Sequence, residues 1–282
     1  MAQLEERTIL HRGGRVRYVI GGEGPPLVLC HGFLGSAENF ETWVDDLAAI
    51  RTLVIPDLPG CGGSDPLDSD RHTSRPLSAA VGAVIDDAGL DSFEVGSLCL
   101  GTCVAMGLVR DRPGAVTRLV LHTPLLAPVL MRPRFHRQVR GLMAPGLFPT
   151  IVWLSRRRLV SDIYKRVLVE GDDIDASAAE MNFRNQVRAN PRALREWLLH
   201  GTNRNDLGLL RRCELPTLIM VATDDRIVDV PALRAAVDDI PAVSMVAIDD
   251  AGHGWTERYV RRQLDLIKAF LADRPLPLTG AA

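Results

Sequence analysis

The stretch of sequence that decides the fold reads Phe93-Glu94-Val95-Gly96-Ser97-Leu98-Cys99-Leu100-Gly101-Thr102-Cys103-Val104-Ala105. It begins as a short apolar strand, continues through a turn of small residues and ends in the start of a helix. Cys99 lies at the turn, and Ser97 and Gly101 are the small residues two positions before and after it. The spacing small-x-Cys-x-small is typical of a sharp strand-to-helix elbow, where bulk at either flanking position would clash. The pattern predicts that Cys99 is a nucleophile held in a sharp turn.

Apolar strands and amphipathic helices alternate on both sides of this elbow. A hairpin pattern covers 8–20, and buried-strand patterns cover 26–30, 52–57, 116–121, 217–222 and 243–248. Helical spacing of apolar residues occurs at 39–49, 77–88, 231–239 and 255–271. This alternation predicts an α/β fold with a mainly parallel sheet that is covered by helices on both faces.

Residues 124–208 break this rhythm. They contain helical segments separated by prolines, and no convincing strand pattern. We therefore expect a helical cap inserted between two parts of one core, 1–123 and 209–282. Charge follows a similar division, since 124–210 contain fourteen basic and eight acidic side chains whereas the rest of the chain is net acidic.

The composition is that of an ordinary soluble protein. The 282 residues are 46% hydrophobic and 24% charged, and the formal net charge of −2 gives no general attraction to nucleic acid or membranes. No apolar run reaches the length of a membrane span, and the acidic N-terminus lacks the apolar centre of a signal peptide. We therefore expect a cytoplasmic protein, and the sequence predicts no particular oligomeric state.

The spacing of the cysteines and glycines disfavours a disulfide framework, a zinc site and a dinucleotide-binding site. Five cysteines with scattered spacing match neither a disulfide framework nor a zinc pattern. A redox pair of Cys99 and Cys103 is a less favoured alternative to two separate thiols. The glycines at 22–32 lack the spacing of a dinucleotide-binding turn, so we expect no metal and no redox cofactor.

Covalent catalysis needs a base beside the nucleophile and a group that orients the base. Cys99 lies at the start of a helix, whose positive end favours the thiolate. The less favoured alternative is that Cys99 is a small buried cysteine with a structural role. The candidate base is His253, on the loop after the last strand. Its competitors include His31 and His122, which lie at other strand ends.

The candidate orienting acid follows the penultimate strand. Asp225 is preferred there, with its neighbour Asp224 and the more distant Asp229 as alternatives. Backbone N–H groups should stabilise an oxyanion. We expect them from Leu100, directly after Cys99, and from Phe33 in the glycine-containing segment 31–36.

These motifs together resemble the α/β-hydrolase superfamily over about residues 8–272. His31-Gly32 resembles the oxyanion segment of that family, and 57–65 resembles its loop after the next strand. Cys99, Asp225 and His253 occur in the family's order of nucleophile, acid and histidine. The resemblance implies a capped α/β-hydrolase fold.

Two departures from the family pattern matter. Ser97 replaces the usual glycine, but serine is small enough for the turn. Cys99 replaces the usual serine, and a laboratory substitution of serine would produce the same pattern. Dienelactone hydrolases also use cysteine, but they resemble this chain less in the His-Gly segment and in the cap.

A sulfur nucleophile affects the substrate class. Its acyl-enzyme is a thioester, so acylation from a thioester is nearly level in energy whereas acylation from a plain ester runs uphill. This chemistry predicts a hydrolase that acts on a thioester, ester or lactone, with thioesters and strained lactones favoured over plain esters. The first alternative is an acyltransferase or cyclase of a biosynthetic pathway that uses the same triad. A second is a non-catalytic ligand-binding protein on the same fold, and a third is proton-transfer or lyase chemistry with His253 as base.

The expected partner is a small acyl substrate. The run Arg156-Arg157-Arg158 is either a solvated helix end or a landing site for an anionic phosphopantetheine carrier or coenzyme A tail. Most apolar residues of 124–208 should be core, but some should line an acyl pocket. The candidates for that pocket are Met131, Phe135, Leu142, Met143, Leu147, Phe148, Trp153, Met181, Phe183 and Trp197.

Overall fold

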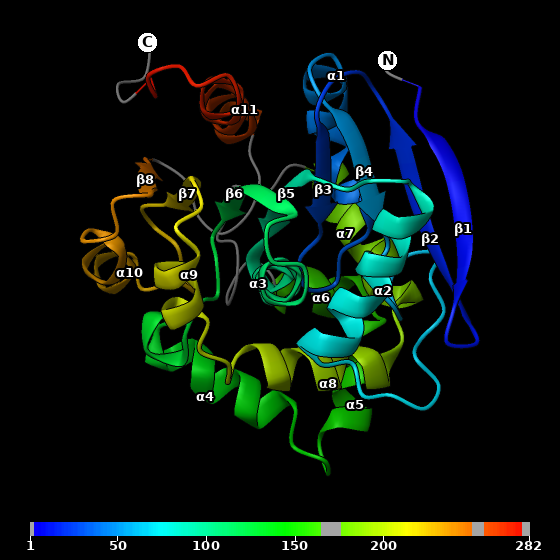
Figure 1. The fold of residues 1–282 in the computed structure, drawn as a ribbon. Helices are drawn as coiled ribbons and strands as arrows, with labels where there is room; N and C mark the ends of the chain where they lie inside the picture. Colours follow the sequence, from blue (N-terminus) through cyan, green and yellow to red (C-terminus); the bar gives the residue numbers. More distant parts are fainter. Residues whose placement is uncertain (1–2, 165–175, 250–256, 278–282) are drawn as a thin grey trace.

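The computed structural model describes residues 3–164, 176–249 and 257–277, which form a central sheet between helices (Figure 1). The described strands form one eight-stranded sheet in the order β1-β2-β4-β3-β5-β6-β7-β8. Their bounds are β1 Glu5–His11, β2 Gly14–Gly21, β3 Pro26–Cys30, β4 Thr52–Pro56, β5 Phe93–Leu98, β6 Val116–His122, β7 Thr217–Ala222 and β8 Val243–Ile248. The pairs β1–β2 and β2–β4 are antiparallel and the other pairs are parallel, so the expected mainly parallel α/β sheet is confirmed.

Helices cover both faces of the sheet, because successive strand side chains point to opposite faces. Leu27 and Leu29 of β3 pack with the helices of one face, whereas Val28 packs with those of the other. The first face is covered by η1 Ala37–Phe40, α1 Glu41–Ala48 and α11 Glu257–Leu271. The second face is covered by α2 Ser74–Asp87, α3 Thr102–Asp111 and α10 Val230–Val237. Figure 1 shows α1 and α11 on one side of the sheet and α3 and α10 on the other.

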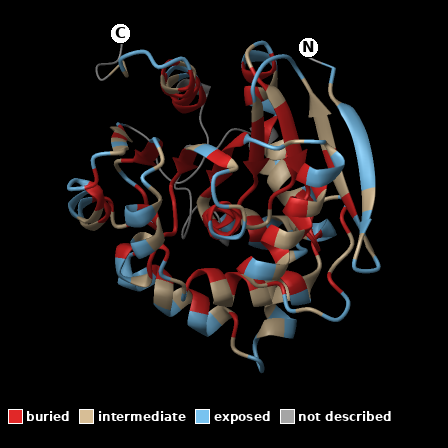
Figure 2. Cartoon of the chain, in the orientation of Figure 1, coloured by how far each residue is buried: buried red, intermediate tan, exposed pale blue. Residues whose placement is uncertain are grey.

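The described chain between β6 and β7 is helical. Its elements are η3 Pro128–Leu130, α4 Pro133–Leu142, α5 Phe148–Ser155, α6 Arg158–Tyr164, α7 Ala176–Arg188, α8 Pro191–Gly201 and α9 Leu207–Cys213. Figure 1 shows α4, α5 and α8 along one side of the molecule. Figure 2 shows that this layer mixes buried and exposed residues, whereas the central strands β3 to β7 are mostly buried. The division into a cap at 124–208 and a core at 1–123 and 209–282 remains a prediction. Among the described helices, none has both the length and the apolar character needed to cross a bilayer.

Candidate active site

The turn between β5 and α3 has the geometry of a strained elbow. Cys99 opens the short helix η2 (Cys99–Gly101) with φ +47°, a left-handed value that is unusual for a residue with a side chain. A Cβ added to Gly101 would lie 2.4 Å from the carbonyl oxygen of His31, so only glycine fits there. Ser97 is buried and its Oγ lies 3.3 Å from Oγ1 of Thr102. The serine that departs from the family pattern thus gains a partner at the start of α3.

The five cysteines are free thiols, but their surroundings differ. Burial raises the pKa of Cys30, Cys61 and Cys103 to about 12, which keeps all three protonated. Cys103 accepts a hydrogen bond of 3.2 Å from the indole N–H of Trp197. Cys99 is instead partly exposed and lies on the wall of a cavity. Because Cys103 is buried and protonated, the contrast disfavours the alternative of a Cys99–Cys103 redox pair.

The cavity beside Cys99, called here the inner cavity, has a volume of about 170 Å³. Leu100, which follows the nucleophile candidate, and Phe33 also lie on its wall. A Cβ on Gly32 would lie 3.3 Å from Cβ of Cys99, so the segment 31–36 packs directly against the elbow. Within the described residues, the backbone N–H of Phe33 has no hydrogen-bond acceptor. The structure therefore brings Cys99, Leu100 and Phe33 together.

His31 holds this segment in place. Its ring is fully buried, and Nε2 accepts a hydrogen bond of 2.9 Å from the N–H of Leu58. Nδ1 must then carry the proton, which it donates to the carbonyl oxygen of Gly32 at 2.9 Å. Burial lowers the pKa of His31, so the ring is neutral near pH 7. Both nitrogens are occupied by backbone partners, which makes His31 a structural residue.

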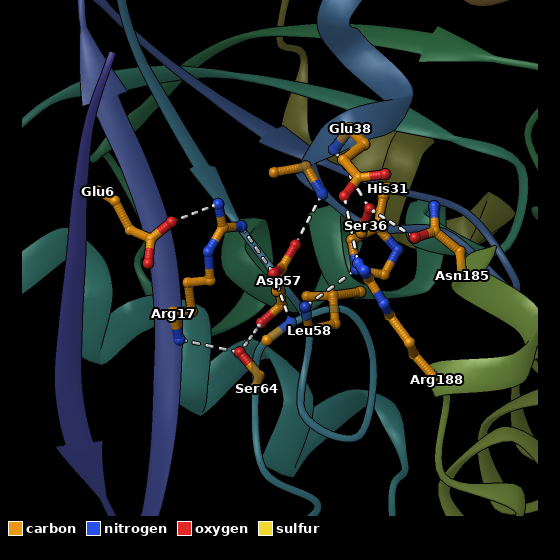
Figure 3. Close-up of polar contacts among 12 residues, drawn as sticks. Glu6, Arg17, His31, Ser36, Glu38, Asp57, Leu58, Ser64, Asn185 and Arg188 are labelled. Carbon is orange, nitrogen blue, oxygen red and sulfur yellow. Dashed lines mark hydrogen bonds and ion pairs between the residues drawn. The ribbon is translucent and has the colours of Figure 1, made fainter. Parts of the chain in front are cut away.

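A buried carboxylate connects the same segment to the loop after β4 (Figure 3). Asp57 accepts hydrogen bonds from the N–H groups of Ala37 at 2.7 Å and Gly63 at 2.8 Å. Its Oδ2 also pairs with the guanidinium of Arg17 at 2.8 Å, which compensates the buried charge. Gly62 has φ +54°, and a Cβ there would lie 2.3 Å from Oδ2 of Asp57. The loop 57–65 therefore supports the site from behind.

Three polar residues form a buried cluster beside the inner cavity. Asp225 is fully buried, and its Oδ1 accepts hydrogen bonds of 2.7 Å from the N–H groups of Ile227 and Val228. His122 lies on the cavity wall and its Nε2 is 2.7 Å from the hydroxyl of Tyr259. Burial raises the pKa of Tyr259 and the nearby charge of Asp225 raises it further, so this hydroxyl stays protonated.

The alternatives for the acid lie in different settings. Asp224 is exposed, and Asp229 caps α10 by accepting a hydrogen bond of 3.1 Å from the N–H of Ala232. Asp225 is the buried one of the three and stays the candidate acid. The candidate base, His253, lies outside the described residues, so the triad Cys99–His253–Asp225 remains a prediction.

Several wall residues were missed by sequence reasoning. Asn39, Asn182 and Gln186 bring carboxamide groups to the inner cavity. Asn39 Nδ2 donates to Asn182 Oδ1 at 3.4 Å, and Gln186 Nε2 donates to the carbonyl oxygen of Ser155 at 2.6 Å. Asn182 and Gln186 belong to α7, and no pattern in the sequence places that helix against η1.

The expected acyl-pocket residues divide into two groups. Phe135, Leu142 and Met143 line the inner cavity, and Phe148 lines a neighbouring one. The remaining candidates line neither cavity, in line with the expectation that most of them do not form the pocket: Met131, Leu147, Trp153, Met181, Phe183 and Trp197. Leu147 and Trp153 are more than half exposed, and Trp197 is buried edge-on against His31. The described residues contain no group of three or more His, Cys, Asp or Glu that could hold a metal ion.

A sequence model of the family described as alpha/beta hydrolase fold matches residues 25–254. The chain belongs to this family. Both the eight-stranded sheet and the elbow after β5 agree with that assignment. Sequence reasoning had identified the same superfamily.

Relatives within the α/β-hydrolase family are mostly named as hydrolases and esterases. The 2-hydroxymuconate semialdehyde hydrolase of Pseudomonas putida is 26% identical over 95% of this chain and 94% of its own length. The dihydrolipoyllysine-residue acetyltransferase component of the acetoin cleaving system of Cupriavidus necator is 35% identical, but over 40% of this chain and 30% of that relative. The chain thus spans less than a third of that longer protein.

Solved structures share the fold. An esterase from Rhodococcus sp. superposes with a TM-score of 0.76 at 23% identity, over 96% of this chain and 99% of the esterase. This likeness confirms the fold, and the relatives named as hydrolases and esterases support an α/β-hydrolase enzyme.

Proposed function

We propose that this enzyme is a hydrolase of thioesters, esters or lactones that forms a covalent acyl-enzyme on Cys99. The observation that carries the proposal is a partly exposed thiol at a strained elbow, on a cavity wall shared with Phe33 and Leu100. Such a turn presents the side chain of its central residue to a substrate. Asp225 and His253 complete the proposed triad.

The proposed chemistry proceeds in two steps. His253 takes the proton of Cys99, and the sulfur attacks the carbonyl carbon of the substrate. The N–H groups of Phe33 and Leu100 stabilise the oxyanion, and its collapse expels the leaving thiolate or alkoxide, which receives the proton from His253. In the second step His253 takes a proton from water, whose oxygen attacks the acyl carbon. This releases a carboxylic acid and returns the proton to the sulfur.

An acyltransferase or cyclase is the second candidate function, because a thioester on Cys99 reacts readily with amines, thiols and alcohols. A non-catalytic ligand-binding protein is the third. Adding an amine or alcohol acceptor to the acylated enzyme separates the first two. Release of acid alone supports hydrolysis, whereas an acceptor-linked product supports transfer.

The central test is acylation by a small acyl thioester of N-acetylcysteamine, followed by intact-mass and peptide analysis. The parent should carry one acyl group on Cys99, and Cys99→Ala should carry none and lose turnover. Cys213→Ala is the matched control, because Cys213 is also partly exposed but lies on α9 away from both cavities. Equal turnover of Cys99→Ala and the parent would refute the proposal.

The base assignment has its own test, in which the pH dependence of Cys99 alkylation is compared between variants. His253→Ala should change the profile if His253 and the thiol share a proton. His122→Phe is the informative counterpart, because His122 is the histidine that lines the inner cavity within the described residues. A profile altered by His122→Phe but not by His253→Ala would move the base to His122.

We further propose that the acyl group arrives on an anionic phosphopantetheine carrier or on coenzyme A. Arg134, Arg137 and Arg140 are exposed on α4, at a spacing that places them on one side of that helix. Within the described residues they form no ion pair. Arg156 is also exposed and borders the cavity beneath α5. These unpaired cations suit an acidic partner.

One member of the predicted arginine cluster has a different role. Arg158 pairs with Asp162 at 2.8 Å and also with Glu180, which corresponds to the solvated-helix interpretation for this residue. Replacing Arg134, Arg137 and Arg140 by Gln should lower kcat/KM for carrier-linked substrates and reduce its salt dependence. The reaction with the N-acetylcysteamine thioester should not change. Equal effects on both kinds of substrate would contradict the charged landing site.

A further inference from the structure

A second cavity, called here the outer cavity, lies beneath α5 and has a volume of about 170 Å³. Its wall is mainly apolar and includes Phe148, Ile151, Val152, Leu154 and Leu194. It is separate from the elbow, since Cys99 and Leu100 do not line it.

The outer cavity adjoins the inner one, because both share the same five wall residues. These shared residues are Phe33, Leu34, Leu142, Met143 and Gln186. Four of the five are apolar and none is charged, so an apolar group that passes between the chambers meets no desolvation penalty from a buried charge. Phe33 takes part in both chambers. Its backbone N–H is the proposed oxyanion donor in the inner cavity, and its side chain belongs to the partition, the set of five residues that both cavities share.

Helix α5 shows that the outer cavity lacks an apolar partner. Its sequence is Phe-Pro-Thr-Ile-Val-Trp-Leu-Ser, yet none of its residues is buried. A helix of this composition ordinarily buries an apolar stripe against the core. Here Phe148, Ile151, Val152 and Leu154 face a cavity instead. A bound apolar group would remove this surface from water and complete the packing of α5.

We propose that the outer cavity binds the distal apolar part of the acyl group while its carbonyl lies at Cys99. This inference rests on the proposed acyl-enzyme and specifies its substrate class: acyl groups of medium to long chain, whose first carbons occupy the inner cavity and whose remaining carbons pass the partition. Acetyl and similar short groups fill the inner cavity alone. Ile151 and Val152 are then residues that determine chain-length specificity.

The test is a chain-length series of N-acetylcysteamine thioesters, from acetyl through butyryl and hexanoyl to decanoyl. For the carbons that enter the outer cavity, kcat/KM should rise by up to about fourfold per methylene. Ile151→Trp should fill the cavity and lower the decanoyl-to-acetyl ratio of kcat/KM by about tenfold or more. Ile151→Ala should enlarge it and shift the preference to longer chains.

Leu159→Trp is the matched control, because Leu159 is 73% exposed on the neighbouring α6 and lines neither cavity. It should leave the ratio of the parent unchanged. The inference is overturned if the parent does not prefer longer chains, or if Ile151→Trp and Leu159→Trp give the same ratio.

A binding measurement separates this inference from the proposed function. Isothermal titration of Cys99→Ala with decanoate and with butyrate requires no turnover. Decanoate should bind more tightly than butyrate, and the added Ile151→Trp substitution should abolish the difference. This result with no acylation of the parent would retain the apolar site and reject the nucleophile. Acylation of Cys99 with no chain-length preference in either measurement would retain the nucleophile and reject the outer cavity as an acyl site.

Discussion

The two sides of the inner cavity are built differently. On the sheet side, His31 and Asp57 are buried and hydrogen-bonded to backbone groups, and Gly101 leaves no room for a side chain. On the side formed by the helices between β6 and β7, α5, which lines the adjoining outer cavity, has no buried residue, and Arg134, Arg137 and Arg140 of α4 form no ion pair within the described residues. We infer from this difference that the sheet side positions the reacting groups, whereas the helices between β6 and β7 determine which acyl groups fit. Backbone packing fixes the nucleophile, whereas side chains with room to change form the rest of the pocket.

Two glycines give the sharpest test of this contrast. Gly101→Ala should destabilise the protein by about 3 kcal/mol, because the new Cβ would meet the backbone of the 31–36 segment, which cannot move away. Gly141→Ala on α4 should instead stabilise it by about 0.5–1 kcal/mol, because a Cβ there meets nothing within 4 Å. Urea unfolding of both variants measures the difference. Similar losses from the two substitutions would show that the helical layer is as tightly packed as the elbow.

Replacing one carboxylate on each side compares how strongly the two sides depend on an ion pair. Asp57→Asn should cost about 3 kcal/mol, because it leaves Arg17 without its buried partner and turns an amide donor toward the N–H of Gly63. Asp162→Asn should cost no more than about 1 kcal/mol, because its pair with Arg158 on α6 is one-third exposed. Chemical denaturation at low salt tests both values. A larger loss of unfolding free energy for Asp162→Asn than for Asp57→Asn would mean that the helices between β6 and β7, and not the sheet side, form the more rigid wall.

Acid should weaken the packing around two fully buried histidines. Burial lowers the pKa of His31 and of His72, so each takes up a proton on unfolding below its ordinary pKa near 6.5. The contribution of these two neutral histidines to the unfolding free energy is therefore fully present above pH 6.5, and it is lost as the pH falls below that value. The slope approaches about 1.4 kcal/mol per pH unit for each histidine. Unfolding free energies at pH 7.5, 6 and 5 measure it, and a His31→Asn variant should show a shallower slope. An unchanged slope would mean that His31 is protonated in the folded protein.

The smallest effect is expected on α4. Arg137→Gln should change the unfolding free energy by no more than about 0.5 kcal/mol, because the exposed guanidinium has no ion pair within the described residues. Thermal unfolding at low and high salt checks this expectation. A loss comparable to that of Asp57→Asn would mean that this arginine supports the fold and is not free for a partner.

Sequence reasoning predicted the features that local pattern controls. The elbow was readable because small residues flank Cys99, and the sheet was readable because buried parallel strands appear as continuous apolar runs. The role of His31 was not readable, because it depends on the N–H of Leu58, which lies 27 positions away. The carboxamides of α7 and the outer cavity were missed for the same reason. Apolar residues at helical spacing look alike whether they fill a core or line a pocket.

Trp197 has a practical consequence for experiments. Its ring lies edge-on to both His31 and Phe33, with centroids 6.0 Å and 6.4 Å away, while its N–H is bonded to the sulfur of Cys103. An acyl group that displaces Phe33 alters the surroundings of this indole directly. Because the chain has four tryptophans, replacing the other three by phenylalanine would leave Trp197 as the single emitter, which can then be followed in stopped flow without attaching a dye.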